Sequence, residues 1–413
     1  MRGIVAIALA LLAAAPAFLQ RLGGLTLPVE LATLCFGLGI VGAAFAMSWA
    51  AEAAERDIPR ALSLTIVALL AVLPEYAVDV IFAFKAGQDP TFAPYAVANM
   101  TGSNRLLLGL GWPAVAGVAW LVSGRRVLRM DRSNGLPLVF LGLATLYSFS
   151  LPFRASVSLV DSGVLFALFA VYAALVARQP TEEPELVGPA AVIGGLPTAS
   201  RRLVILGLFA FAGATIAISA EPFAEGLVHT GQRLGLDEFL LIQWLAPLAS
   251  ETPEFLVAIL LALRGKGGAA LGLLLSAKVN QWTLLVGSLA VAYSLGTGHA
   301  AALPLDQRQV GEVLLTAAQS FFGVAVLAGL AFTLREAALL AVLFASQLAL
   351  GAILRAGVHN ADAASVELYG FAGLYLVFGA WQFFHAWWGL RRVVRRGVTT
   401  LLEDRNGRRE RAA

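Results

Sequence analysis

The sequence is poor in charge. Asp, Glu, Lys and Arg make up 13% of its 413 residues, against about 25% in soluble domains. Hydrophobic residues make up 59%, and the mean hydropathy is +0.80. This composition excludes a water-soluble globule, and it predicts an all-α polytopic membrane protein.

Cysteine is almost absent, and catalytic motifs are missing. The single cysteine, Cys35, lies within an apolar stretch, which excludes an internal disulfide and a cysteine-ligated metal cluster. No nucleotide-binding loop, nucleophile elbow or His-Glu zinc pattern occurs, so we expect no enzymatic activity and no cofactor. The basic isoelectric point of about 9.2 comes largely from an Arg-rich tail and loops, which we interpret as an orientation signal beside anionic lipid rather than as a nucleic-acid site.

Twelve apolar stretches are long enough to span a bilayer, which takes roughly 17 to 25 residues. Their predicted ranges are 3–20, 30–50, 61–84, 93–122, 136–153, 157–177, 203–230, 238–263, 268–296, 310–333, 336–355 and 366–390. The connections on one side carry 21 Lys and Arg residues, and those on the other carry 6. The positive-inside rule therefore places both termini and the 178–202 linker in the cytoplasm.

The sequence contains an internal repeat. The segments 40–87 and 222–267 each hold a span, a short polar turn and a second span with Pro-Glu near its centre. The second Pro-Glu pair lies in the fifth span after the first, an odd offset, so the duplicated helices enter the membrane from opposite faces. Inverted repeats of this kind place a binding site near the bilayer midplane.

The domain organisation follows from this repeat. The Pro- and Gly-rich linker between the halves is expected to be flexible. The first stretch has the charged start and apolar run of a secretory signal, so a cleaved signal peptide and an extra helix both remain open. We predict a signal peptide or extra helix at 1–29, two repeats of five helices at 30–178 and 203–355, a cytoplasmic linker at 179–202, and an extra helix with a basic tail at 356–413.

The Pro-Glu pairs place Glu75 and Glu254 at bilayer depth. An uncompensated carboxylate there costs at least ~2.5 to 3.5 kcal/mol, so it marks an ion or proton pathway. Each proline also frees a backbone carbonyl four residues earlier, and a carbonyl beside a carboxylate suits a hard cation. A plain helix kink is the alternative, and the repetition favours the site.

Further carboxylates share faces with these two. Asp79 lies four residues after Glu75, and Glu251 lies three before Glu254, so each pair shares a helical face. Paired carboxylates in a low dielectric repel unless a proton or a cation lies between them, and either suits exchange. The alternative is that Asp79 and Glu251 only support the ligands. Two more carboxylates, at 221 and 225, extend the cation path or lie at the outer interface.

These motifs resemble the cation/calcium antiporter superfamily, which includes the sodium/calcium exchangers and their calcium/proton relatives. The first copy has Leu73-Pro74-Glu75 and Gly102-Ser103-Asn104, and the second keeps Ser250, Pro253 and Glu254. The resemblance covers residues 30 to 355. It implies a multi-pass protein of the plasma or inner membrane that exchanges cations by alternating access.

The chain departs from the family pattern at several ligand positions. Ala71 and Val72 replace a hydroxyl pair, and Leu107 replaces a later amide or acid. In the second copy, Lys278 replaces the asparagine of Gly-Ser-Asn, and Gln281 takes the later position. A buried ammonium can take the place of a monovalent cation and titrate, which would couple transport to protons. A fixed salt bridge to Glu251 or Glu254 is the alternative.

We therefore predict a secondary-active antiporter that exchanges calcium or sodium against protons or sodium. Its partners are inorganic cations and the bilayer, and the sequence leaves the oligomeric state open. A passive channel and a transport-inactive scaffold are the alternative functions. The predicted metal ligands are Glu75 and Glu254, and the full predicted cation and proton site is Glu75, Asp79, Ser103, Asn104, Ser250, Glu251, Glu254, Lys278 and Gln281.

The predicted topology can be tested with single cysteines. We expect cysteines placed at Ser133 and Thr198 to react with a reagent supplied on the cytoplasmic side, because the positive-inside rule puts both there. A cysteine at Gln88 should react only from outside. The Cys35→Ser protein serves as the unlabelled control, and equal access to Gln88 and Thr198 from one side would overturn the inverted repeat.

Overall fold

A computed structural model describes residues 2–54, 56–57, 73–179, 186–355 and 365–385, with side chains in the segment that starts at Leu73 described from Tyr76 onward. The first half contains α1 (Arg2–Arg21), α2 (Val29–Ala54), α4 (Leu73–Gln88), η1 (Pro90–Phe92), α5 (Ala93–Leu106), η2 (Leu107–Gly111), α6 (Trp112–Ser123), β1 (Val127–Arg129), η3 (Arg132–Asn134), α7 (Gly135–Ser148), α8 (Ser150–Arg154), β2 (Ser156–Val157) and α9 (Leu159–Val176). The second contains α10 (Gly188–Gly194), α11 (Thr198–Leu234), α12 (Glu238–Leu263), α13 (Gly267–Asn280), η4 (Gln281–Leu285), α14 (Val286–Thr297), β3 (Leu303–Pro304), α15 (Gln307–Leu327), β4 (Ala331–Thr333) and α16 (Leu334–Ile353).

The predicted all-α membrane fold is confirmed. Ten helices in the described residues are long and apolar enough to cross a membrane, and they correspond to ten of the twelve predicted stretches. Of the other two, the stretch 61–84 begins outside the described residues and continues as α4. The stretch 366–390 is a helix over 365–385, after which the described part of the chain ends.

The two halves repeat the same order of elements. In each, a 14-residue α-helix leads into a five-residue π-helix and then a 12-residue α-helix. These are α5, η2 and α6 in the first half, and α13, η4 and α14 in the second. Both α9 and α16 begin with a capping box, which satisfies backbone N–H groups at the start of the helix. The capping box of α9 consists of Ser158 and Asp161, and that of α16 consists of Thr333 and Glu336.

Short strands, which the sequence did not predict, join the halves within each of two compact units. The first unit comprises Met1–Leu106, Ala155–Val257 and Thr283–Gln309, and the second comprises the remaining segments. In the first unit β2 pairs antiparallel with β3, Val157 opposite Leu303. In the second, β1 pairs with β4, Leu128 opposite Phe332. Each pair contains one strand from each half.

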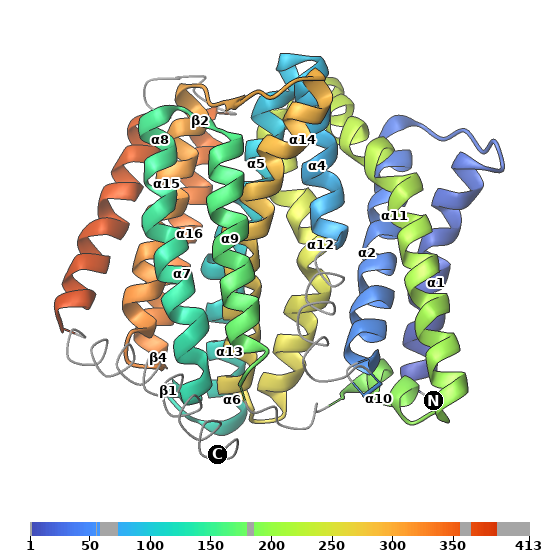
Figure 1. Ribbon diagram of the computed structural model, residues 1–413, viewed down its shortest axis with the longest axis horizontal. Helices are drawn as coiled ribbons and strands as arrows, with labels where there is room; N and C mark the ends of the chain where they lie inside the picture. The colour runs from blue at the N-terminus through green and yellow to red at the C-terminus, as the bar shows by residue number, and fades with distance from the viewer. Residues whose placement is uncertain (1, 55, 58–72, 180–185, 356–364, 386–413) are drawn as a thin grey trace, which may run out of the picture. The chain divides into compact units, whose positions relative to one another are not determined.

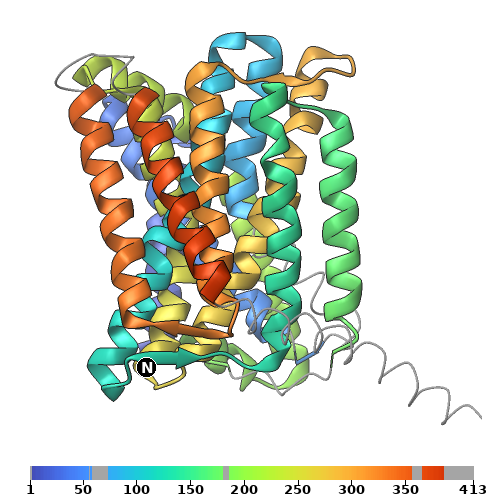
Figure 2. The same ribbon diagram turned by 90° about the vertical axis from the view of Figure 1, so that its left-hand side faces the viewer.

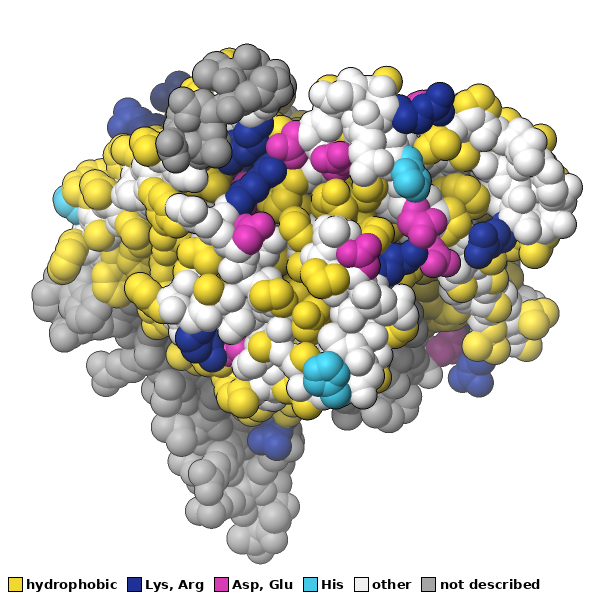
Figure 3. Space-filling view, turned by 90° about the horizontal axis from the view of Figure 1, so that it is seen from above, with side chains coloured by type: hydrophobic (Ala, Val, Ile, Leu, Met, Phe, Trp, Pro, Cys, Tyr) yellow, Lys and Arg dark blue, Asp and Glu magenta, His cyan; other side chains and the backbone are white. Residues whose placement is uncertain are grey.

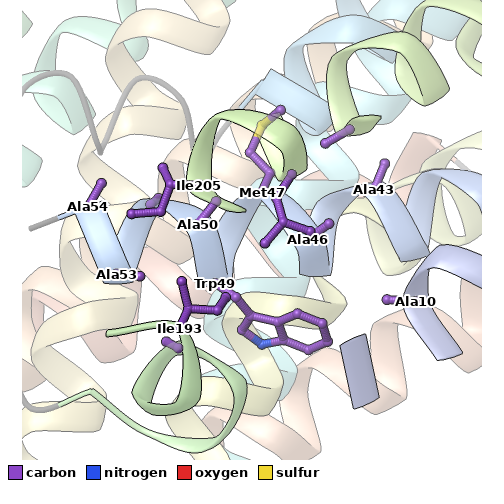
Figure 4. Close-up of a cluster of buried hydrophobic side chains, with 14 of the residues drawn as sticks. Ala10, Ala43, Ala46, Met47, Trp49, Ala50, Ala53, Ala54, Ile193 and Ile205 are labelled. Atoms are coloured by element: carbon purple, nitrogen blue, oxygen red, sulfur yellow. The ribbon is translucent and has the colours of Figure 1, made fainter. Parts of the chain in front are cut away.

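In the first unit, α1, α2, α10 and α11 pack into a bundle (Figure 1). Its core is rich in alanine, and Figure 4 shows Trp49 and Met47 among the alanines of α2, with Ile193 of α10 and Ile205 of α11. Small residues let helix backbones approach closely, which supplies the van der Waals contact on which packing in lipid depends. Thus a Cβ at Gly42 would overlap the Ala10 carbonyl oxygen of α1.

The linker contains more structure than its composition predicts. Its α10 buries Ala190 and Ile193 against the bundle core. Arg56 donates a hydrogen bond to the Gly194 carbonyl at 3.0 Å, and Arg201 binds both carboxylate oxygens of Asp57 at 2.7 Å. The Arg201 hydrogen bonds hold the pKa of Asp57 below its usual value, so this ion pair persists at neutral pH.

In the second unit, the helix 365–385 lies against α15, as Figure 2 shows for the red and orange ribbons. A buried ionic cluster supports this contact. The Arg355 guanidinium is 3.1 Å from Glu367 and 3.9 Å from Glu312, and Gln347 donates to Glu367 at 2.6 Å. The extra C-terminal helix is therefore joined to α15 and α16 by charge as well as by apolar packing.

Within the first unit, α5 and α12 approach each other closely at Gly102. A Cβ built on Gly102 would overlap the carbonyl oxygen of Gln243 in α12. Beside this contact, the Gln243 amide donates to the Thr101 hydroxyl at 3.2 Å, and both side chains are buried. The glycine of Gly-Ser-Asn thus permits a backbone contact that no larger residue allows.

This contact makes a prediction about stability. We expect Gly102→Ala to lower the free energy of unfolding by about 1 to 3 kcal/mol, because the new methyl group must displace backbone rather than a flexible side chain. Thermal unfolding in detergent measures the effect. Gly213→Ala in α11 is the matched control, since nothing lies within 4 Å of its added Cβ. Equal melting temperatures for both variants would contradict the proposed contact.

Candidate cation-binding site

The first predicted carboxylates lie on α4. Asp79 is fully buried, and its Oδ1 accepts a hydrogen bond from the Asn99 amide of α5 at 2.9 Å. The backbone of Glu75 lies one turn earlier in the same helix, and its side chain lies outside the described part. The carboxylate that sequence analysis paired with Glu75 is therefore held by an amide from the next helix.

The two polar residues of Gly-Ser-Asn are buried on α5. The Ser103 hydroxyl donates to the Asn99 carbonyl at 2.9 Å, and the Asn104 amide donates to the Met100 carbonyl at 2.9 Å. Both donors bond to their own helix one turn back. Their side-chain oxygens are acceptors, so these residues suit the ligation of a cation or the donor of a neighbouring group.

The second pair of carboxylates lies on α12. Glu251 is buried, Glu254 is partly buried, and Pro253 stands between them within the helix. The buried Ser250 hydroxyl donates to the Ala246 and Pro247 carbonyls, each at 3.3 Å. The part of this helix up to Val257 belongs to the first unit, as do α4 and α5, so the first unit contains both Pro-Glu motifs and the first Gly-Ser-Asn.

The remaining predicted residues, Lys278 and Gln281, belong to the second unit. Lys278 is fully buried near the end of α13, and its ammonium lies 5.5 Å from the ring centroid of Trp282, a cation–π contact. The Trp282 indole N–H donates to the Ser320 hydroxyl of α15 at 2.5 Å. Gln281 is buried and begins the π-helix η4.

Equivalent positions in the two halves hold side chains of different chemical type. Asn104 and Lys278 are each the twelfth residue of their 14-residue helix, and Leu107 and Gln281 each open the following π-helix. Because π-helical turns often occur at functional sites, their position one turn after these residues fits a binding region. The structure thus supports the sequence alignment that puts an ammonium where the first half has an amide.

Sequence analysis missed the polar and aromatic contacts between α5 and α12. Besides Thr101 and Gln243, the Arg105 guanidinium lies 4.9 Å from the Trp244 ring, and it is almost fully buried. The amide of Gln243 within an apolar span was the sequence signal that could have indicated this contact, because polar side chains at bilayer depth bridge helices.

The predicted residues gathered in the first unit are chemically suited to a hard cation or to protons. Their side chains offer carboxylate, amide and hydroxyl oxygens, the ligands that calcium and sodium prefer. Among the described residues, no three His, Cys, Asp or Glu side chains converge as a metal cluster. A cation here would be transported cargo.

Comparison with known proteins agrees with this chemistry. The profile of the family "Sodium/calcium exchanger protein" matches the chain twice, over residues 30–178 and 204–352. The predicted duplication is therefore confirmed. No curated protein sequence gave a match.

Solved structures extend the comparison. The chain is similar to a crystal structure of the H+/Ca2+ exchanger CAX, with a TM-score of 0.89 and 41% identity over 96% of this chain and 98% of that one. It shares its fold with YfkE (TM-score 0.55, 15% identity, 90% and 99% covered) and with the sodium-calcium exchanger NCX_Mj (0.53, 18%, 78% and 98%). The chain therefore belongs to the sodium/calcium exchanger protein family and is a multi-pass membrane antiporter of cations.

Proposed function

We propose that the chain exchanges calcium against protons across the plasma or inner membrane, as a transporter without enzymatic activity. The observation that carries this proposal is Lys278, a buried ammonium at the position that Asn104 occupies in the other half. The 41% identity to an H+/Ca2+ exchanger over nearly the whole chain supports it.

The identity of residue 278 as a lysine favours protons over sodium as the coupling ion. An ammonium is a compact positive charge that a lysine side chain can gain or lose with a proton, whereas an asparagine stays neutral and offers an oxygen. A site with Lys278 therefore has an internal monovalent cation and one oxygen ligand fewer for sodium. Leu107, at the position equivalent to Gln281, removes another. Both changes disfavour sodium as the exchanged ion.

The carboxylates of the two Pro-Glu motifs favour calcium as the transported cation. We assign Glu75 and Glu254 as the acidic ligands of calcium, with Asp79 and Glu251 supporting them. The same oxygens cannot hold a divalent cation and protons together, because each form compensates the same negative charge. Competition for one site gives exchange when the site changes sides only while it holds calcium or protons: calcium leaves when protons arrive, and the reverse. Ser103, Asn104, Ser250 and Gln281 are assigned as neutral oxygen ligands.

The central test is neutralisation of the two glutamates. We expect Glu75→Gln and Glu254→Gln each to abolish calcium flux into proteoliposomes without unfolding the protein, since an amide keeps the volume and loses the charge. Glu30→Gln, at the partly exposed start of α2, is the matched control and should transport normally. Flux above about half of the wild-type value in both site variants would refute the assignment, and flux without a counter-ion would indicate a channel.

A second test addresses proton coupling. Wild-type calcium flux should follow an imposed pH gradient and ignore sodium. Lys278→Asn should weaken the dependence on pH, because the replaced group no longer exchanges a proton. Lys266→Asn, at the exposed start of α13, controls for the loss of a lysine elsewhere in the same segment. A wild-type protein that needs sodium and is indifferent to pH would assign Lys278 a structural role.

A further inference from the structure

One ionic cluster joins the first site helix to the α1, α2, α10, α11 bundle. The Lys85 ammonium, near the end of α4, lies 2.9 Å from Glu221 and 2.5 Å from Glu225 of α11. Arg21 lies 4.0 Å from Glu221, and the Phe92 ring is 5.8 Å from the ammonium. Lys85 thus holds two carboxylates that sequence analysis assigned either to a cation path or to the outer interface.

The cluster lies at the end of α4 that the positive-inside rule places outside the cell. This end is at the top of Figure 1, and Figure 3 views it from above, where acidic and basic side chains lie next to one another. Lys85 is on the same helix as Glu75 and Asp79. Any displacement of the outer end of α4 from α11 would therefore have to separate Lys85 from its two carboxylates.

The solvent exposure of these three side chains determines how easily their ionic contacts can separate. The side chains of Lys85, Glu221 and Glu225 are 17%, 48% and 45% exposed, so water can replace the ionic contacts when they separate. Pairs of this kind shift an equilibrium by roughly two- to fivefold. The Arg355 and Glu367 side chains, at 7% and 0%, form a buried pair whose loss shifts an equilibrium by more than about a hundredfold. The outer cluster is weak enough to break in every cycle.

The backbone of α11 is also weakened at this point. Pro222 follows Glu221 directly and lacks an N–H, so the Ile218 carbonyl has no helical donor. Prolines are the usual place at which a long helix bends. The two carboxylates therefore flank the residue about which α11 can most readily change direction.

We infer that Lys85, Glu221 and Glu225 form a clasp that holds the outer entrance closed and opens once in each transport cycle. Lys85 is a positioning residue: it acts through α4 and does not touch the cargo. The inference rests on the proposed calcium–proton exchange only in using calcium as the probe. Pairs inside the bundle, such as Glu30 with Arg233, join helices that need not separate.

The test measures calcium dependence separately from each side, in vesicles of known orientation. For Lys85→Gln we expect the half-saturating calcium concentration to fall roughly two- to fivefold on the outer side and to rise on the inner side, because the outward-open state becomes more populated. Glu221→Gln with Glu225→Gln should act alike, and Lys85→Arg should restore wild-type values. Arg233→Gln, which removes the ion pair with Glu30 within the bundle, should change neither side.

A cross-link supplies a second readout that does not depend on the folding of Lys85→Gln. In a Cys35→Ser background, Lys85→Cys and Glu225→Cys joined by a cleavable bifunctional thiol reagent should stop transport, and cleavage should restore it. Equal changes of calcium dependence on both sides, or full transport by the cross-linked protein, would overturn the clasp. If another cation proves to be the cargo, the calcium–proton proposal fails, and the same sided measurement made with that cation still tests the clasp.

Discussion

Polar groups inside an apolar helical bundle must find partners within the protein, because the hydrocarbon of the bilayer offers none. This constraint organises the candidate site. Asp79 accepts from Asn99, and the side chains of Ser103, Asn104 and Ser250 donate to carbonyls of their own helices. Donor capacity is thereby used locally. The same helices also carry carboxylate and amide oxygens, the kind of group that a transported cation needs.

The same constraint explains why the sequence was informative about the fold. A span of a bilayer needs a long apolar stretch, and a carboxylate within such a stretch is rare enough to mark function. Both signals are local in sequence. The sequence therefore predicts the spans and the two Pro-Glu pairs without knowledge of any tertiary contact. It also predicts that Lys278 occupies, in the second repeat, the position that Asn104 occupies in the first.

Contacts between distant segments could not be predicted in this way. Lys85 and Glu225 are 140 residues apart, and nothing local to either indicates that α4 and α11 meet there with their charges opposed. The strand pairs depend equally on distant segments, since β1 pairs with β4 rather than with a neighbour in sequence. The packing of α10 was missed because its Gly- and Pro-rich composition indicates a loop, while its few apolar residues are buried by the bundle.

The π-helical turns η2 and η4 have a consequence for the helices that follow them. Each contains one residue more per turn than the α-helix around it, so it changes the rotational phase between the segment before and the segment after. Successive residues of an α-helix are about 100° apart. A deletion of one residue at Leu107–Gly111 would therefore change, by about this angle, the rotational relation between the residues of α5 and those of α6 along the span. The extra residue lets one continuous span present a polar face in one half of its length and an independently oriented packing face in the other.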